Sequence, residues 1–139
     1  MRKLLKSQKG FTLVELLAVI VILAIIAAIA VPSVGHLISK SKDNAKVAEA
    51  IEIISASKTY VAAENDQLSF NDNTASITEE QLAPYIDNLK DNSWTITVTK
   101  DANTESYSYS INDHDDPVSD AHSNSASEQQ LLDYNTGND

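Results

Sequence analysis

Residues 11–34 form an apolar segment that constrains the fold of this chain more than any other feature. Its sequence is FTLVELLAVIVILAIIAAIAVPSV, and Glu15 is its one ionisable side chain. As an α-helix, a segment of this length extends about 36 Å, whereas the hydrocarbon core of a bilayer is about 30 Å thick. A chain of 139 residues is too small to enclose such a helix on all sides. The sequence therefore predicts a transmembrane helix over 11–34 rather than a buried helix of a soluble protein.

The composition restricts the classes of function. The chain has 10 Lys and Arg against 20 Asp and Glu, a formal net charge of -10. Such a surface repels nucleic-acid phosphates, so we expect no direct binding of nucleic acid. The chain has no cysteine, which excludes disulfides, thiolate metal sites and a cysteine nucleophile. The sequence shows no nucleophile elbow, catalytic triad or phosphate loop, and we expect no enzymatic activity.

The segment before the apolar run is basic. Such a stretch is typical of a targeting signal and favours a cytoplasmic N-terminus. Two processing sites are compatible with it. Cleavage after Ala30, at a small-x-small site, would release a secreted acidic protein, whereas cleavage after Gly10 would leave the apolar helix in the mature chain. The first ten residues contain four cations and no acid: Arg2, Lys3, Lys6 and Lys9.

Residues 9–17, KGFTLVELL, resemble the class III signal sequence of type IV prepilins and pseudopilins. The resemblance extends from Lys9 to about Asn65. It implies that a membrane prepilin peptidase cuts between Gly10 and Phe11. It also implies that the same enzyme family methylates the new amino group of Phe11. Glu15 would become the fifth mature residue, a position associated in this family with registration of subunits in the filament.

The chemistry of Glu15 agrees with that role. A Glu inside a membrane costs about 2.5 kcal/mol or more unless it finds a partner. Cleavage after Gly10 would create a cationic amino group on Phe11, at the i,i+4 spacing from Glu15 within one helix. Between neighbouring subunits, Glu15 of one would pair with the terminus of another. We hypothesise that this ion pair helps set axial register; the alternative is a Glu15 that snorkels to the headgroups.

Pro32 matches a helix-disrupting proline of type IV pilins. A proline cannot donate the helical hydrogen bond and crowds the carbonyl four residues earlier, at Ala28. Gly35 adds backbone flexibility nearby. We therefore predict a helix kink at Pro32 in the free subunit, and the same place is a candidate weak point that opens when helices pack. Ala24 departs from the family pattern, in which many pilins have Gly there.

We expect residues 35–65 to continue the helix as an amphipathic segment, and residues 66–112 to form a small α+β head. Leu68 to Ile77 form a polar connection in this prediction, and a capping box that begins at Thr78 opens a short helix that ends near Lys90. Pro84 predicts either a break after Leu82 or a restart of the helix at Pro84. Alternation over 94–99 and 107–111 predicts an antiparallel hairpin that packs on the helix. The expected fold class is α+β: a long N-terminal helical spine with a small antiparallel sheet head, pilin-like. The helix stripe that faces the head consists of Val47, Ile51, Ile54 and Val61.

We expect residues 113–139 to form an acidic and partly disordered tail. Within it, Leu131 and Leu132 would dock a last helical turn onto the head. We expect no cofactor. Oxygen-rich side chains suit Ca²⁺, but the spacing matches no EF-hand, and a solvated acidic loop is the favoured interpretation. A zinc site built from two histidines is a weaker alternative. The weak candidate calcium ligands are Asp113, Asp115 and Asp116, and the two histidines are His114 and His122.

The sequence therefore predicts a leader peptide, residues 1–10, followed by a structural subunit of a type IV pilus-like filament. It would be a major pilin or a competence pseudopilin for DNA uptake. The alternatives are a type II secretion pseudopilin and a single-span membrane-anchored binding protein that does not polymerise. The resemblance implies a prepilin peptidase, an assembly ATPase, a membrane platform protein and a homo-oligomeric filament. It places the precursor in the bacterial cytoplasmic membrane and the filament at the cell surface, in the periplasm or in the cell wall.

Overall fold

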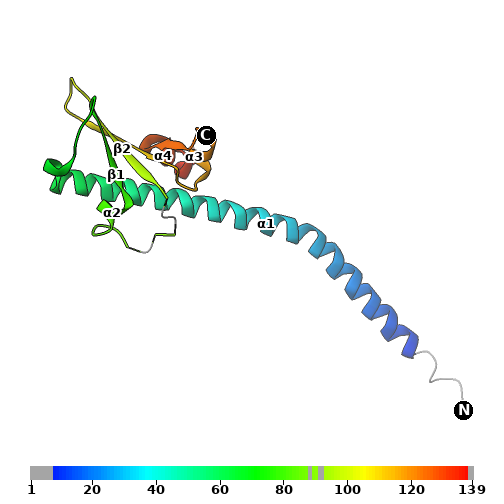
Figure 1. Cartoon of the computed structure of the whole chain (residues 1–139). Helices are drawn as coiled ribbons and strands as arrows, with labels where there is room; N and C mark the ends of the chain where they lie inside the picture. The colour runs from blue at the N-terminus through cyan, green and yellow to red at the C-terminus, as the bar shows by residue number, and fades with distance from the viewer. Residues whose placement is uncertain (1–7, 88, 91–92, 138–139) are drawn as a thin grey trace, which may run out of the picture. The chain divides into compact units, whose positions relative to one another are not determined.

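The computed structural model describes residues 8–87, 89–90 and 93–137, coloured from blue to red along the chain in Figure 1. The chain divides into two compact units, Met1–Ser41 and Lys42–Asp139. We call the second of these the globular unit. Each unit contains part of one long helix, and the β-sheet lies in the globular unit.

Helix α1 comprises Gln8–Ala63, 56 residues in one helical run. It confirms the long N-terminal helix expected from the sequence. The helix begins before the expected Phe11 and ends at Ala63 rather than at Asn65. A single 3₁₀ turn, η1 (Asn65–Gln67), follows the helix. The helix persists over its second half because the sequence there contains no Gly or Pro after Gly35.

The sheet has four antiparallel strands in the order β1-β2-β3-β4, and each strand pairs with the next along the chain. This confirms the α+β class with a small antiparallel sheet. Strand order follows chain order because short connections join neighbouring antiparallel strands. The strands are β1 (Thr74–Thr78), β2 (Thr95–Lys100), β3 (Tyr107–Asn112) and β4 (Ser125–Ser127).

Strands β2 and β3 form the hairpin that the alternating pattern predicted. Ile96 lies opposite Ile111, and Val98 lies opposite Tyr109. All four side chains are buried, and so is Trp94 just before β2. The alternation places these residues on one face because successive side chains in a strand point to opposite sides.

Strand β1 lies where the sequence predicted a polar connection over Leu68 to Ile77, so that prediction was wrong from Thr74 to Ile77. Ala75 and Ile77 are buried on the same face as the hairpin residues, whereas Thr74, Ser76 and Thr78 are exposed. The alternation was easy to overlook because the strand is short and one of its two inward side chains is only a methyl group.

The core of the globular unit lies between α1 and the inward face of the sheet. The predicted stripe is confirmed: Val47, Ile54 and Val61 are buried, and Ile51 is partly buried against them. Figure 1 shows β1 and β2 lying along this part of α1. Further residues of α1 that the stripe did not include are buried in the same core: Ala50, Ile53, Ala56, Ser57 and Tyr60.

Helix α2 is shorter than expected, Glu79–Leu82, and does not continue to Lys90. Its start confirms the capping box, because the Gln81 side chain accepts a hydrogen bond from the Thr78 N–H at 3.0 Å. It breaks after Leu82, the earlier of the two ends that Pro84 allowed. The connection that follows is tied to α1 by the Lys90 N–H, which donates to Glu49 Oε1 at 2.7 Å.

Most of the predicted C-terminal tail is folded, which corrects the expectation of an irregular segment from residue 113 onward. Helix α3 (Pro117–Ala121), strand β4 and helix α4 (Glu128–Thr136) occupy it. Few apolar residues suffice because side-chain hydrogen bonds cap both short helices, α3 and α4. Leu131 docks in the core as predicted, whereas Leu132 stays exposed, and the other buried apolar residues of this segment are Val118 and Ala126.

Candidate processing and assembly segment

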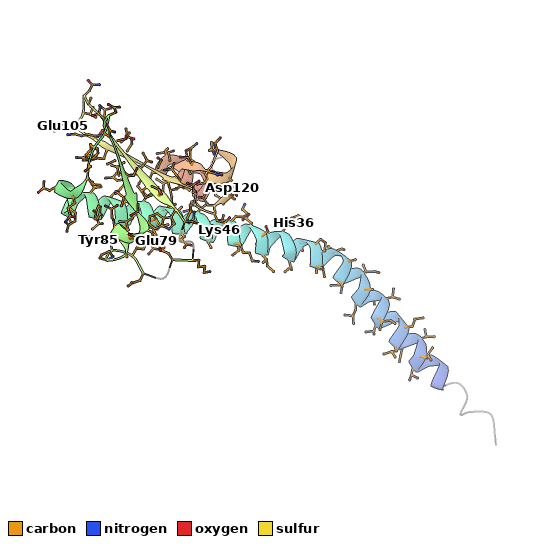
Figure 2. The ribbon with its side chains drawn as sticks, in the orientation of Figure 1. His36, Lys46, Glu79, Tyr85, Glu105 and Asp120 are labelled. Carbon is orange, nitrogen blue, oxygen red and sulfur yellow. The ribbon has the colours of Figure 1, made fainter. Side chains whose placement is uncertain are left out.

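The first part of α1 presents an apolar surface on all its sides. Every large hydrophobic side chain from Leu13 to Ile38 exposes half or more of its surface. Among the described residues, α1 is the helix whose length and composition suit a membrane span, and none of its most apolar window is buried. Figure 2 shows these side chains projecting from the ribbon. A surface of this kind is stable in lipid or against other helices, but not in water.

The predicted processing site lies at the beginning of this helix. Gly10 and Phe11 both have helical backbone, so the bond between them falls within the first turn of α1. Glu15 lies one turn after Phe11, which places the two residues on the same helix face. Glu15 is exposed among apolar neighbours and forms no ion pair with any described residue.

Pro32 lies inside α1 and leaves the carbonyl of Ala28 without its helical donor. Ser33 Oγ donates to the carbonyl of Ala30 at 2.9 Å, a local bond that satisfies a neighbouring carbonyl. A Cβ added to Gly35 would meet no atom within 4 Å, so packing within the chain does not require a glycine at this position. The kink at Pro32 stays a prediction.

The acidic segment after β3 contains a buried network instead of a loop of free carboxylates. Asp116 is fully buried and caps α3: its Oδ1 accepts from the backbone N–H groups of Val118 and Ser119 at 2.9 and 2.8 Å. Its Oδ2 accepts from Ser119 Oγ at 2.7 Å and lies 3.0 Å from His114 Nδ1. Burial alone would raise the pKa of Asp116, but the hydrogen bonds from His114 and Ser119 outweigh it and hold the pKa below its ordinary value.

Two of the three weak candidate calcium ligands, Asp115 and Asp116, interact with other groups of the protein. Asp116 is the N-cap of α3, and Asp115 Oδ2 lies 2.8 Å from the ammonium of Lys46 on α1. His122 Nδ1 lies 2.8 Å from the carbonyl of Val118, so His122 is engaged within α3 and does not join His114 in a zinc site. Across residues 8–87, 89–90 and 93–137, no three metal-ligand side chains converge on one point.

Sequence reasoning missed the structural role of Asp116, although a local signal for it exists. Asp before Pro is a common helix start, because Asp caps the first N–H groups and Pro fits the first helical position. The same applies to α4, where Gln130 Oε1 accepts from the Ser127 N–H at 2.9 Å, as expected for a Ser-x-x-Gln capping box.

A long apolar N-terminal helix that continues into a small antiparallel α+β unit is a pilin-like architecture. Comparison with known proteins agrees with it. The model of the prokaryotic N-terminal methylation motif matches residues 5–31. This match covers both residues of the predicted cleavage site and Glu15.

Two curated proteins of Moraxella bovis are similar to the chain. Fimbrial protein Q is 48% identical over 59 residues, which are 42% of this chain and 35% of that protein. Type IV major alpha-pilin is 41% identical over 76 residues, 55% of this chain and 43% of that protein. The chain thus spans less than half the length of either relative. No solved structure matches the chain significantly. These matches confirm the resemblance to type IV pilins that residues 9–17 carry.

Proposed function

We propose that this chain is a structural subunit of a type IV pilus-like filament, cleaved after Gly10 and polymerised through the apolar half of α1. One observation carries the proposal: a prepilin-type motif lies at the beginning of α1, whose large apolar side chains from Leu13 to Ile38 are all exposed. A membrane anchor alone would require the apolar helix but not the motif. The filament requires both.

The exposed apolar surface of α1 explains how one segment serves two states. Before assembly, lipid covers it, and in the filament, copies of the same helix would cover it. Helices approach closely where small residues lie at their contacts, and close approach increases the van der Waals packing between them. The apolar segment offers such residues, all of them exposed: Ala24, Ala27, Ala28 and Ala30.

Processing would change the charge of the chain as well as its length. The leader carries four cations and no acid, so its removal changes the formal net charge from -10 to -14. It also places a new amino group on Phe11, which stays cationic after methylation. Glu15 has no ion-pair partner among the described residues. The amino group of Phe11 in a neighbouring copy would satisfy it in apolar surroundings and would fix the axial position of one helix against the next.

The partners of this function are a prepilin peptidase, an assembly ATPase and a membrane platform protein. The precursor would reside in the bacterial cytoplasmic membrane, and the filament would extend to the cell surface, the periplasm or the cell wall. The acidic globular unit argues that any DNA carried by a competence filament is bound by another subunit. Tight binding of duplex DNA by this chain would contradict that assignment.

Expression of the full chain in cells that contain an assembly system tests the proposal. We expect sheared preparations to contain filaments of this chain under electron microscopy. The variant Gly10→Val should stay unprocessed and should yield no filaments, because the peptidase requires the small residue before the scissile bond. The matched control variant Gly35→Val has the same substitution outside the motif, so it should still be cleaved. Filaments built from uncleaved Gly10→Val would contradict the proposal.

A further inference from the structure

The globular unit carries an acidic hollow. It has a volume of about 250 Å³, and its lining includes three carboxylates together with His114. Figure 2 labels Asp120, a residue of α3, and Lys46, a residue of α1, in the same region of the globular unit. The residues that line the hollow are Ser93, Asp113, His114, Asp115, Asp120 and Asn124.

His114 lines the hollow and has one polar atom without a hydrogen-bond partner among the described residues. Its side chain is 2% exposed, and its Nδ1 faces the carboxylate of Asp116. Because the carboxylate of Asp116 can only accept, Nδ1 carries the proton of that bond. The other ring nitrogen, Nε2, is buried without a partner in the described part of the chain. In the neutral imidazole with its proton on Nδ1, Nε2 is a hydrogen-bond acceptor. This nitrogen and the three carboxylates together favour a ligand that donates hydrogen bonds and carries positive charge.

The lining already binds one ammonium group. Lys46 Nζ lies 2.8 Å from Asp115 Oδ2. The hydrogen bond to Asp115 raises the pKa of Lys46, and the negative charge of Asp120 adds to the increase. The hollow therefore suits the head of a lysine, whereas the described residues do not group as ligands of a metal ion.

The chain itself offers unpaired lysines. Lys46, Lys58 and Lys100 form ion pairs within the chain. Lys40 and Lys42 are exposed, follow the apolar segment directly, and form no ion pair with any described residue. Lys90 is likewise exposed without an ion pair among the described residues, but it lies far along the chain from the apolar segment. In a mature chain with 20 acidic residues, Lys40 and Lys42 are therefore the positive charges next to the apolar segment that are still available to another molecule.

We propose that Lys40 or Lys42 of one copy places its ammonium in the acidic hollow of a neighbouring copy during assembly. The inference rests on the filament function proposed above. The two contacting surfaces of this pair are different parts of the chain, so the contact is heterologous and can repeat without closing, as a filament requires. Charge pairing of this kind suppresses wrong registers and offsets repulsion between acidic globular units.

Charge exchange between separate chains tests this contact. One variant, Lys40→Glu with Lys42→Glu, removes the donor, and a second, Asp120→Lys, introduces a cation at the hollow. Each alone should lower the filament yield of the full chain by about tenfold or more. Co-expression of the two should restore the yield, because the glutamates of one chain then face Lys at position 120 of the other. The matched controls Lys90→Glu and Asp87→Lys, at exposed positions outside the contact, should assemble normally.

The outcomes separate this inference from the filament function. Wild-type filaments with no defect in either variant would overturn the contact. Two defective variants whose filament yield is not restored by co-expression would also overturn the contact. That result is expected if the lysines bind lipid phosphates, or if the ion pair forms within one chain. Absence of filaments from the wild-type chain would instead contradict the proposed function itself.

Discussion

His114 Nδ1 lies 3.0 Å from Asp116 Oδ2, and both side chains are buried in the segment that follows β3. The same carboxylate caps α3 and accepts from Ser119. One acidic side chain therefore satisfies four hydrogen-bonding groups that would otherwise lack partners. This explains how an acidic and serine-rich segment folds with few apolar residues.

Asp116→Ala should destabilise the full chain by about 2–4 kcal/mol, because it removes an N-cap and leaves a buried histidine without its partner. Asp116→Asn should cost less, since its amide oxygen still caps α3. Urea denaturation in detergent, followed by the fluorescence of Trp94, measures both effects. As a control, Asp120→Ala changes an exposed neighbour in the same helix. Equal stability of Asp116→Ala and wild type would show that the network contributes nothing.

The stability of the globular unit should decrease in acid through Asp116. Its pKa in the folded chain lies below the ordinary value of 3.8. A group with a lowered folded pKa stabilises the fold fully above its unfolded pKa and loses that contribution as the pH falls through the folded value. The difference in stability between wild type and Asp116→Asn should therefore be constant near neutral pH and shrink below about pH 4. A difference that grows in acid would contradict this sign.

Glu105→Gly should stabilise the globular unit by up to about 1 kcal/mol, because a side chain costs energy in the left-handed conformation that glycine adopts freely. Glu105 has a φ of 54° in the turn between β2 and β3. Its contact with Lys100 at 3.8 Å is exposed and contributes little. Thermal melting of the full chain measures the effect, and Glu105→Gln, which keeps the side-chain strain, is the control. A loss of stability in Glu105→Gly would show that the exposed ion pair outweighs the strain.

Glu15→Ala should abolish assembly without preventing membrane insertion. Removal of the carboxylate makes insertion easier by about 2.5 kcal/mol, so a loss of filaments cannot come from a failure to insert. We expect filament yield to fall by about tenfold or more while the membrane-bound pool stays full. Glu52→Ala, at an exposed position on the same helix beyond the apolar segment, should assemble like wild type. Normal filaments from Glu15→Ala would exclude an ion pair as the source of register.

The sequence predicted those parts of the fold that depend on continuous local patterns. Each of these patterns repeats over several residues and is compatible with one kind of structure. The apolar run and the stripe predict a helix, and the alternation predicts strands β2 and β3. Strand β1 was missed because Ala75 is a weak apolar signal. The contacts of the last segment were missed because their partners are distant in sequence: Lys58 pairs with Glu128, 70 positions away. The prepilin-type motif could be predicted because its residues are contiguous in the sequence.

Mass spectrometry of the N-terminus of the assembled protein tests the central claim most directly. The account predicts a chain that begins at Phe11 and carries one methyl group on its amino nitrogen. A chain that begins at Val31 would identify a secreted protein without its apolar helix. Retention of Met1 and the basic residues after it in the functional form would contradict processing, and with it assembly through an ion pair between Glu15 and a new terminus.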